Sequence, residues 1–156
     1  MKIIKLIVSI ALCQAAGVIG SFFTIPAIPT WFAQLTKPSF SPPNWIFSPV
    51  WISLYLLMGI AFFIVWMKGW DKPKVKKAMA FFLVQLGLNV LWSILFFGLR
   101  SPLAGVIEII FLWGAIGLTV YYFLQLSRFA GWLLVPYWCW VSFASILTFS
   151  LWRLNP

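Results

Sequence analysis

The chain contains no histidine, and this absence limits the chemistry that its other polar residues can perform. Histidine is the usual general base and the commonest metal ligand of proteins. Without it, the serines and the two cysteines, Cys13 and Cys139, lack a partner that could activate them as nucleophiles. No Walker loop, GxGxxG sequence or Cys-x-x-Cys pair occurs. Conventional hydrolase, kinase and dehydrogenase chemistry is therefore excluded, and we predict neither a conventional catalytic set nor a metal site.

Glu108 is the one carboxylate within an apolar run of the sequence. The composition, described below, indicates that such apolar runs lie in a membrane. An acid at that depth is costly, which makes Glu108 a candidate for function. It lies only about two turns into its expected helix, ~8 Å at 1.5 Å per residue, where the helix dipole favours an anion. Arg100, in the preceding turn, is placed to help neutralise it. These features favour a structural role for this carboxylate.

Aromatic and amide side chains recur at helical spacing in three apolar segments. Residues three or four apart lie on one face of a helix, so each set forms a stripe. Lipid tails are already apolar and need no indole or amide to face them, so such stripes in a membrane indicate a lined cavity. Tight packing by the aromatic side chains is the alternative. The stripes are Trp51, Tyr55, Met58, Phe62 and Trp66; Gln85, Asn89, Trp92 and Phe96; and Trp140, Ala144 and Thr148.

The composition indicates whether the chain is a soluble or a membrane protein. Of its 156 residues, 63% are hydrophobic and only 8% are charged, a balance far from that of a soluble domain. The formal net charge of +9 raises the question of nucleic acid, but the cations lie between apolar runs rather than on one helical face. We therefore predict an integral membrane protein whose basic residues set its topology and contact lipid headgroups, with no nucleic-acid partner.

Five apolar runs of about the length needed to cross a bilayer predict an all-α bundle of five transmembrane helices in one domain, residues 1–156. The first run could also be a secretory signal, but it is longer than an ordinary h-region, and we favour a retained helix. An odd number of helices does not divide into two inverted halves, which disfavours alternating access within one chain. The expected helices span about 6–26, 46–67, 78–98, 103–126 and 131–153.

Basic residues are unevenly divided between the two expected sides of the membrane. Eight fall on the side of the N-terminus and three on the other, so the positive-inside rule places the N-terminus inside and the loop after the first helix outside. The eight are Lys2, Lys5, Lys68, Lys72, Lys74, Lys76, Lys77 and Arg128, and the three are Lys37, Arg100 and Arg153.

Small residues recur along the first helix and include the pair Ala16-x-x-x-Gly20. Such pairs let two helices approach closely. The neighbour could be a helix of the same chain or a second copy of the chain, and the sequence leaves both open.

The loop after the first helix is rich in proline and tryptophan. Residues 31–51 hold four prolines and three tryptophans, which fix the backbone and supply contact area, so we expect a structured lid rather than a linker. Its pattern, Trp-aromatic-x-x-Leu-x-Lys-Pro-Ser-aromatic-x-Pro-Pro-x-Trp followed by Val-Trp, resembles the signature of the translocator protein (TSPO/MBR) family, also called tryptophan-rich sensory proteins. The stretches 85–98 and 133–155 agree, so the resemblance covers nearly the whole chain.

The resemblance implies a five-helix bundle, a homodimer, in which the first loop closes a pocket for tetrapyrroles such as protoporphyrin or haem. In some members of the family the ligands are sterols or drug-like molecules. No covalently bound cofactor is implied. The ligand site that we predict is formed by Trp51, Trp140, Asn89, Trp92, Ala144, Tyr55, Phe40, Trp31, Trp45 and Leu147.

Three functions fit this resemblance, and the sequence excludes none of them. The chain could bind or sense porphyrins, carry them or sterols between membranes, or degrade porphyrins with light and oxygen through tryptophan radicals at Trp51 and Trp140. We expect a binding protein with a sensing or transport role rather than an enzyme. A bacterial cell membrane is the expected location, and an outer membrane is the alternative that the family leaves open.

Sterol binding is the least supported of these roles. A loose cholesterol-recognition pattern runs from Leu118 through Tyr122 to Arg128, but such patterns are weak. At the end of the fifth helix, where animal members of the family carry such a motif, this chain has Phe149 in place of tyrosine and Leu147-Thr148 in place of the common Leu-Asn pair. Both departures count against a sterol site there.

Overall fold

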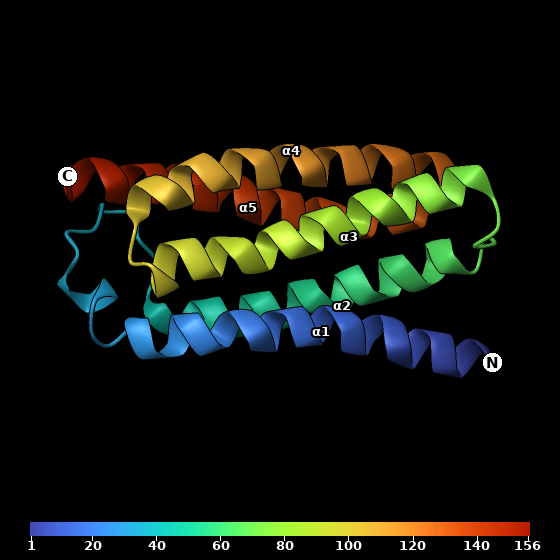
Figure 1. Cartoon of the computed structure of the whole chain (residues 1–156), viewed down its shortest axis with the longest axis horizontal. Coiled ribbons are helices and arrows are strands. Elements are labelled where there is room, and N and C mark those ends of the chain that lie inside the picture. Colours follow the sequence, from blue (N-terminus) through green and yellow to red (C-terminus); the bar gives the residue numbers. More distant parts are fainter.

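Five long helices form the molecule, as a computed structural model that describes residues 1–156 shows (Figure 1). Each is long and apolar enough to cross a membrane. A short π-helical segment, Ile94–Gly98, continues α3. The helices are α1 (Lys2–Ala27), α2 (Phe47–Trp66), α3 (Pro73–Ser93), α4 (Pro102–Leu126) and α5 (Arg128–Leu154). The all-α membrane bundle predicted from the sequence is confirmed.

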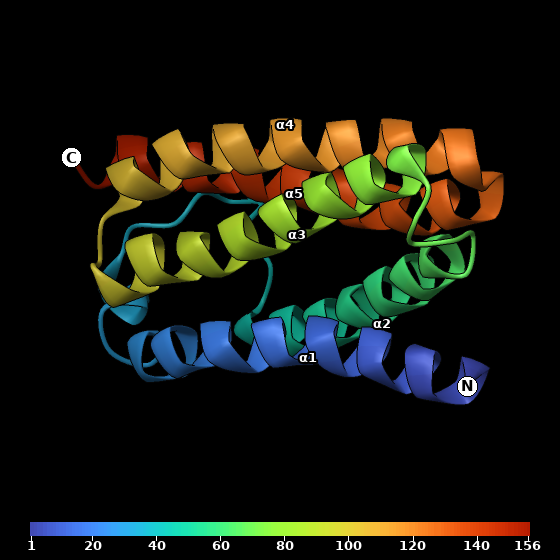
Figure 2. The same ribbon diagram turned by 45° about the vertical axis from the view of Figure 1, so that its right-hand side comes forward.

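The helices pack mainly against their neighbours in the chain. α1 lies beside α2, and α4 packs against both α3 and α5, while α1 also contacts α3 and α2 contacts α5 (Figures 1 and 2). The largest cluster of buried apolar side chains joins all five helices and includes the fully buried Met58, Phe82 and Phe123. Phe82 stacks on Phe123 with ring centroids 5.7 Å apart.

Two helices begin earlier in the chain than the apolar runs suggested. α1 begins at Lys2 rather than near residue 6, and α3 begins at Pro73 rather than near residue 78. Proline is well placed at the first position of a helix, where its missing N–H has no partner to lose. Lysines are good helix formers, and their long side chains can reach the headgroups from the first turns.

The π-helical segment Ile94–Gly98 was not expected from the sequence. Its wider turn is closed by the Leu99 N–H, which donates to the carbonyl of Ile94 at 2.8 Å. Gly98 lies against the ring of Phe23, and a Cβ there would be 2.9 Å from that ring. Such segments are frequent at functional sites.

The loop between α1 and α2 is an ordered lid, which the sequence predicted. It contains two 3₁₀ turns, Phe32–Gln34 and Asn44–Ile46. Asn155, at the end of α5, holds the lid: its side chain accepts from the Thr36 N–H and donates to the Thr36 carbonyl, both at 2.9 Å. Lys37 Nζ donates to the carbonyl of Phe32 at 2.8 Å. The cover is therefore tied to the helix bundle at a point distant in sequence.

The two ends of the bundle differ in charge. The N-terminus, the turn between α2 and α3 and the turn between α4 and α5 lie at one end, and the lid and the C-terminus lie at the other (Figure 1). The eight basic residues assigned to the side of the N-terminus are thus gathered at one end of the molecule, and the other three lie at the lid end.

Candidate ligand-binding site

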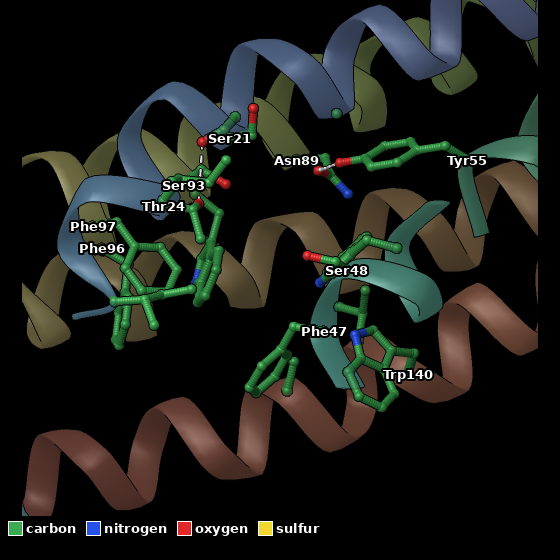
Figure 3. Close-up of a pocket in the computed structure, with 18 of the residues that line it drawn as sticks. Ser21, Thr24, Phe47, Ser48, Tyr55, Asn89, Ser93, Phe96, Phe97 and Trp140 are labelled. Atoms are coloured by element: carbon green, nitrogen blue, oxygen red, sulfur yellow. Dashed lines mark hydrogen bonds between the residues drawn. The ribbon is translucent and has the colours of Figure 1, made fainter. Parts of the chain in front are cut away.

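A cavity of about 370 Å³ lies in the lid half of the bundle and receives side chains from all five helices and from the lid (Figure 3). Ligand sites for small molecules usually measure roughly 300–1,000 Å³ and are lined mainly by apolar and aromatic side chains. Here 18 of the 27 lining residues are hydrophobic. By its lining, this cavity is the best candidate for a binding site in the chain.

Two indoles predicted from the sequence lie on the α2 and α5 side of the cavity, and both are lining residues. Trp140 of α5 makes an edge contact with Phe47, the first residue of α2, with ring centroids 6.1 Å apart. Trp51 lies one turn after Phe47 and contacts the rings of Tyr55 at 5.6 Å and Tyr137 at 6.2 Å. Both indoles are partly buried, so each has a face held by protein and some surface left for a ligand.

Trp92 and Phe96 form the opposite wall. They lie one turn apart, where α3 passes into the π-helical segment, and their rings are stacked 4.9 Å apart with an interplanar angle of 10°. Phe97 meets the edge of both rings. The wider π turn allows two successive phenylalanines to reach this wall, which explains why the segment matters for the site.

A hydrogen-bonded network of buried polar side chains forms the floor. The Tyr55 hydroxyl donates to Asn89 Oδ1 at 2.6 Å, and Asn89 Nδ2 donates to the Tyr137 oxygen at 2.7 Å. Tyr137 in turn donates to Gln85 Oε1 at 2.7 Å. Tyr55 and Asn89 line the cavity, whereas Gln85 and Tyr137 lie behind them. The network joins α2, α3 and α5, and it fixes two of the polar side chains that line the cavity.

Gly17 of α1 is required by the position of Tyr55. A Cβ at residue 17 would lie 2.7 Å from the Tyr55 ring, closer than real contacts allow. The phenol can reach Asn89 because α1 presents no side chain there.

One polar atom in the wall has no partner. The indole N–H of Trp92 is buried and makes no hydrogen bond. A buried donor of this kind costs free energy of about 1–3 kcal/mol unless something accepts from it. This indole N–H is thus an unpaired donor held inside the wall.

The lid residues that the sequence suggested do not line the cavity, and their neighbour Phe32 does. The 3₁₀ turn buries Phe32 and leaves Trp31 against the outer side of Phe96, at 5.4 Å between ring centroids. Phe40 lies against Phe143 at 6.3 Å, and Trp45 is 72% exposed. The other seven predicted site residues do line it: Trp51, Tyr55, Asn89, Trp92, Trp140, Ala144 and Leu147.

Sequence reasoning missed the contribution of α1. Four polar or small residues at helical spacing line the cavity along one face of this helix: Gln14, Gly17, Ser21 and Thr24. That spacing was visible in the sequence and could have indicated a site. The pair Ala16 and Gly20 is buried within the chain, and a Cβ at Gly20, which also lines the cavity, would lie 3.1 Å from Ser93 Oγ, so this pair serves packing inside the bundle.

The cavity also reaches the surface of the bundle between α1 and α2. Three lining side chains there, Val18, Ile25 and Ile52, are exposed by 56%, 66% and 59%. Gln14 Nε2 donates to the Ile52 carbonyl at 3.1 Å and joins the two helices at this edge. The opening faces the region that lipid tails occupy around a membrane protein.

Glu108 does not belong to this site. It is 5% exposed and does not line the cavity. Neither of its carboxylate oxygens has a hydrogen-bond partner, so the neutralising contact with Arg100 that the sequence suggested is not formed.

Comparisons with known proteins agree with these features. The chain is 50% identical to the tryptophan-rich protein TspO of Archaeoglobus fulgidus over 99% of both chains. It is 46% identical to the tryptophan-rich protein TspO of Chlorobaculum tepidum, over 99% of this chain and 98% of the relative. The human translocator protein is 35% identical over 88% of this chain and 82% of its own. The TspO/MBR family model matches residues 9–153. This chain, a multi-pass membrane protein, belongs to the TspO/MBR family.

Proposed function

We propose that this protein binds tetrapyrroles, protoporphyrin or haem, in the cavity beneath the lid, and that binding serves a sensing or transport role in the membrane. The observation that carries the proposal is the pair of aromatic walls: Trp51 and Trp140 on one side, and Trp92 stacked with Phe96 on the other. Flat conjugated rings are bound well by such faces, because each aromatic contact contributes about 0.5–1.5 kcal/mol beyond the burial of area.

The names of relatives support a role of this kind. A relative from Cereibacter sphaeroides, 36% identical over 80% of this chain, is called a tryptophan-rich sensory protein, and the human relative is called a translocator protein. Those names describe sensing and translocation in the relatives. We extend to this chain the common element, which is the recognition of a ligand within the membrane.

The opening between α1 and α2 supports a ligand that enters from the bilayer. Val18, Ile25 and Ile52 are apolar and exposed there, so a membrane-dissolved molecule could pass without crossing water. A tetrapyrrole is a broad plane for a cavity of about 370 Å³, and the opening leaves room for its edge to extend beyond the bundle.

Iron should matter little for affinity. The lining residues include no histidine, cysteine or methionine, and the one phenol among them, Tyr55, already donates to Asn89. Binding would then rest on stacking against the aromatic walls, which is the same whether iron is present or not.

A titration of the purified protein with protoporphyrin, haem and cholesterol tests the proposal directly. We expect both tetrapyrroles to quench tryptophan fluorescence saturably, with dissociation constants within a few-fold of each other, and cholesterol to bind more weakly. Failure of both tetrapyrroles to saturate would overturn the proposal. A strong preference for haem with a low-spin spectrum would contradict binding by stacking, but it would not contradict tetrapyrrole binding itself.

Light- and oxygen-dependent degradation of the porphyrin is a second candidate function. The observation that favours it is the position of Trp51, which lines the cavity and lies within ring contact of Tyr55 and Tyr137, two further oxidisable side chains. A degrading enzyme would convert bound protoporphyrin into a new product under light and oxygen, and would leave it unchanged in the dark. A sensor would bind without product, and a carrier would show saturable flux in proteoliposomes.

A further inference from the structure

A second hollow lies at the end of the bundle opposite to the lid, between the last turns of α4 and the first turns of α5. This groove measures about 400 Å³ and is lined by five residues: Tyr121, Leu124, Gln125, Arg128 and Trp132. None of them lines the cavity beneath the lid. The groove is therefore a separate feature of the surface.

The connection between the two helices builds the groove. α4 ends at Leu126 and α5 begins at Arg128, so a single residue turns the chain and holds the helices side by side (Figures 1 and 2). Leu124 forms the floor because it lies against Gly131, where any Cβ would overlap its side chain. With Leu124 drawn down onto the glycine, the hollow between the outer side chains stays open.

The side chains of the groove are polar at the end of the bundle and become more apolar one turn further along the helices, toward the middle of the membrane. Gln125 and Arg128 lie in the outermost turn of their helices, and both are exposed. Tyr121 and Trp132 lie one turn further in, ~6 Å deeper at 1.5 Å per residue, with exposed fractions of 57% and 64%. An arginine above two exposed rings suits an amphiphile whose phosphate lies outward and whose chain lies inward, because guanidinium binds phosphate through two parallel hydrogen bonds.

The charge of this end selects the kind of headgroup. Eight of the eleven basic side chains lie here, and Asp71 is the one acid among them. Basic residues near a membrane surface attract anionic lipid headgroups. A headgroup with a net negative charge is therefore favoured over a zwitterionic one.

The sterol pattern of the sequence does not correspond to one surface. Tyr122, its central residue, is stacked on Phe81 of α3 at 5.1 Å and 15°, and Lys77 Nζ lies 4.9 Å from its ring. Arg128 lies instead in the groove with Tyr121. The pattern from Leu118 to Arg128 is thus divided between two faces of α4.

We propose that the groove between α4 and α5 binds one anionic glycerophospholipid of the adjacent leaflet, with its phosphate on Arg128 and Gln125 and an acyl chain between Tyr121 and Trp132. The lipid would be bound in the protein without tetrapyrrole, at a site independent of the tetrapyrrole cavity.

Native mass spectrometry of the full chain, titrated in detergent with phosphatidylglycerol and phosphatidylcholine of identical acyl chains, tests the proposal. We expect the first phosphatidylglycerol to bind at least five-fold more tightly than phosphatidylcholine. Arg128→Gln should remove this preference, whereas the matched variant Arg153→Gln, at the lid end, should keep it. Trp132→Ala should weaken the binding of both lipids.

The proposal is overturned if wild type binds the two lipids equally, or if Arg128→Gln and Arg153→Gln behave alike. Displacement of phosphatidylglycerol by cholesterol would overturn it in favour of a sterol groove. Protoporphyrin binding and the thermal unfolding midpoint are measured for each variant, and both should stay unchanged in Arg128→Gln. A loss of lipid preference that accompanies loss of either property would assign Arg128 a structural role and contradict the proposal.

Discussion

The tryptophans of this chain divide by what their rings touch. Trp51 and Trp140 lie on the cavity, whereas Trp66 packs on Phe62 and Trp70 at the basic end, with Lys5 Nζ 5.4 Å from its ring. The site can therefore be tested by replacing tryptophan with phenylalanine in both groups and comparing the effects.

Replacing Trp51 or Trp140 by phenylalanine should weaken porphyrin binding by about fivefold, because a stacked indole contributes about 1 kcal/mol beyond area burial and 1.4 kcal/mol is tenfold in affinity. Trp66→Phe and Trp70→Phe should leave binding unchanged. Fluorescence titration measures the dissociation constant of porphyrin for each of the four variants. Equal effects at all four positions would mean that the cavity is not the site.

The polar floor makes a separate prediction about stability. Tyr137→Phe leaves Gln85 Oε1 without its donor and Asn89 Nδ2 without its acceptor, and each buried group left unpaired costs about 1–3 kcal/mol. The thermal unfolding midpoint should fall by several degrees. Tyr121→Phe, on an exposed phenol, is the control and should change it little. If the two variants have the same thermal unfolding midpoint, the network does not stabilise the bundle.

Among the elements, the helices were the most predictable and the lid the least. Apolar runs of bilayer length indicate helices whatever their detailed packing, so all five were expected. The first turns of α1 and α3 were missed because lysines such as Lys5 and Lys74 are polar yet helical, and hydropathy alone cannot separate a helical turn with snorkelling lysines from a loop.

Side-chain direction in the lid could not be predicted for a physical reason. Proline and tryptophan content indicates order, but whether Trp31 or Phe32 faces inward depends on the rotation of one 3₁₀ turn. The face of α1 was missed for another reason: small residues at helical spacing suit both close packing and a cavity wall, and here Gly17 and Gly20 do both.

The tie between the lid and α5 should control the escape of the ligand. Asn155→Ala removes both hydrogen bonds to Thr36, so dissociation of bound protoporphyrin should quicken severalfold while association changes less. Stopped-flow displacement measures the rate. Asn44→Ala, at an exposed position of the same lid, is the control. An unchanged rate would show that the tie between Asn155 and Thr36 does not retain the ligand.

For the whole molecule, the separation of charge predicts its orientation. Lys74 and the N-terminus should lie on one side of the membrane, and Ser39 and Arg153 on the other. Single cysteines introduced at residues 74 and 39, in a chain with Cys13 and Cys139 replaced by alanine, should react differently with an impermeant reagent in intact vesicles. Identical labelling of the two positions would contradict the five-span arrangement.

The contact between Asn155 and Thr36 also orders events during synthesis. The two residues are 119 positions apart, so a ribosome makes the lid long before it makes the side chain that holds it. α5 brings Trp140 to the cavity and Asn155 to the lid in the same step. A nascent chain with four helices inserted has neither the complete aromatic wall nor the secured cover. Under the proposed function, a tetrapyrrole would find a complete and covered site only after the last helix has entered the membrane.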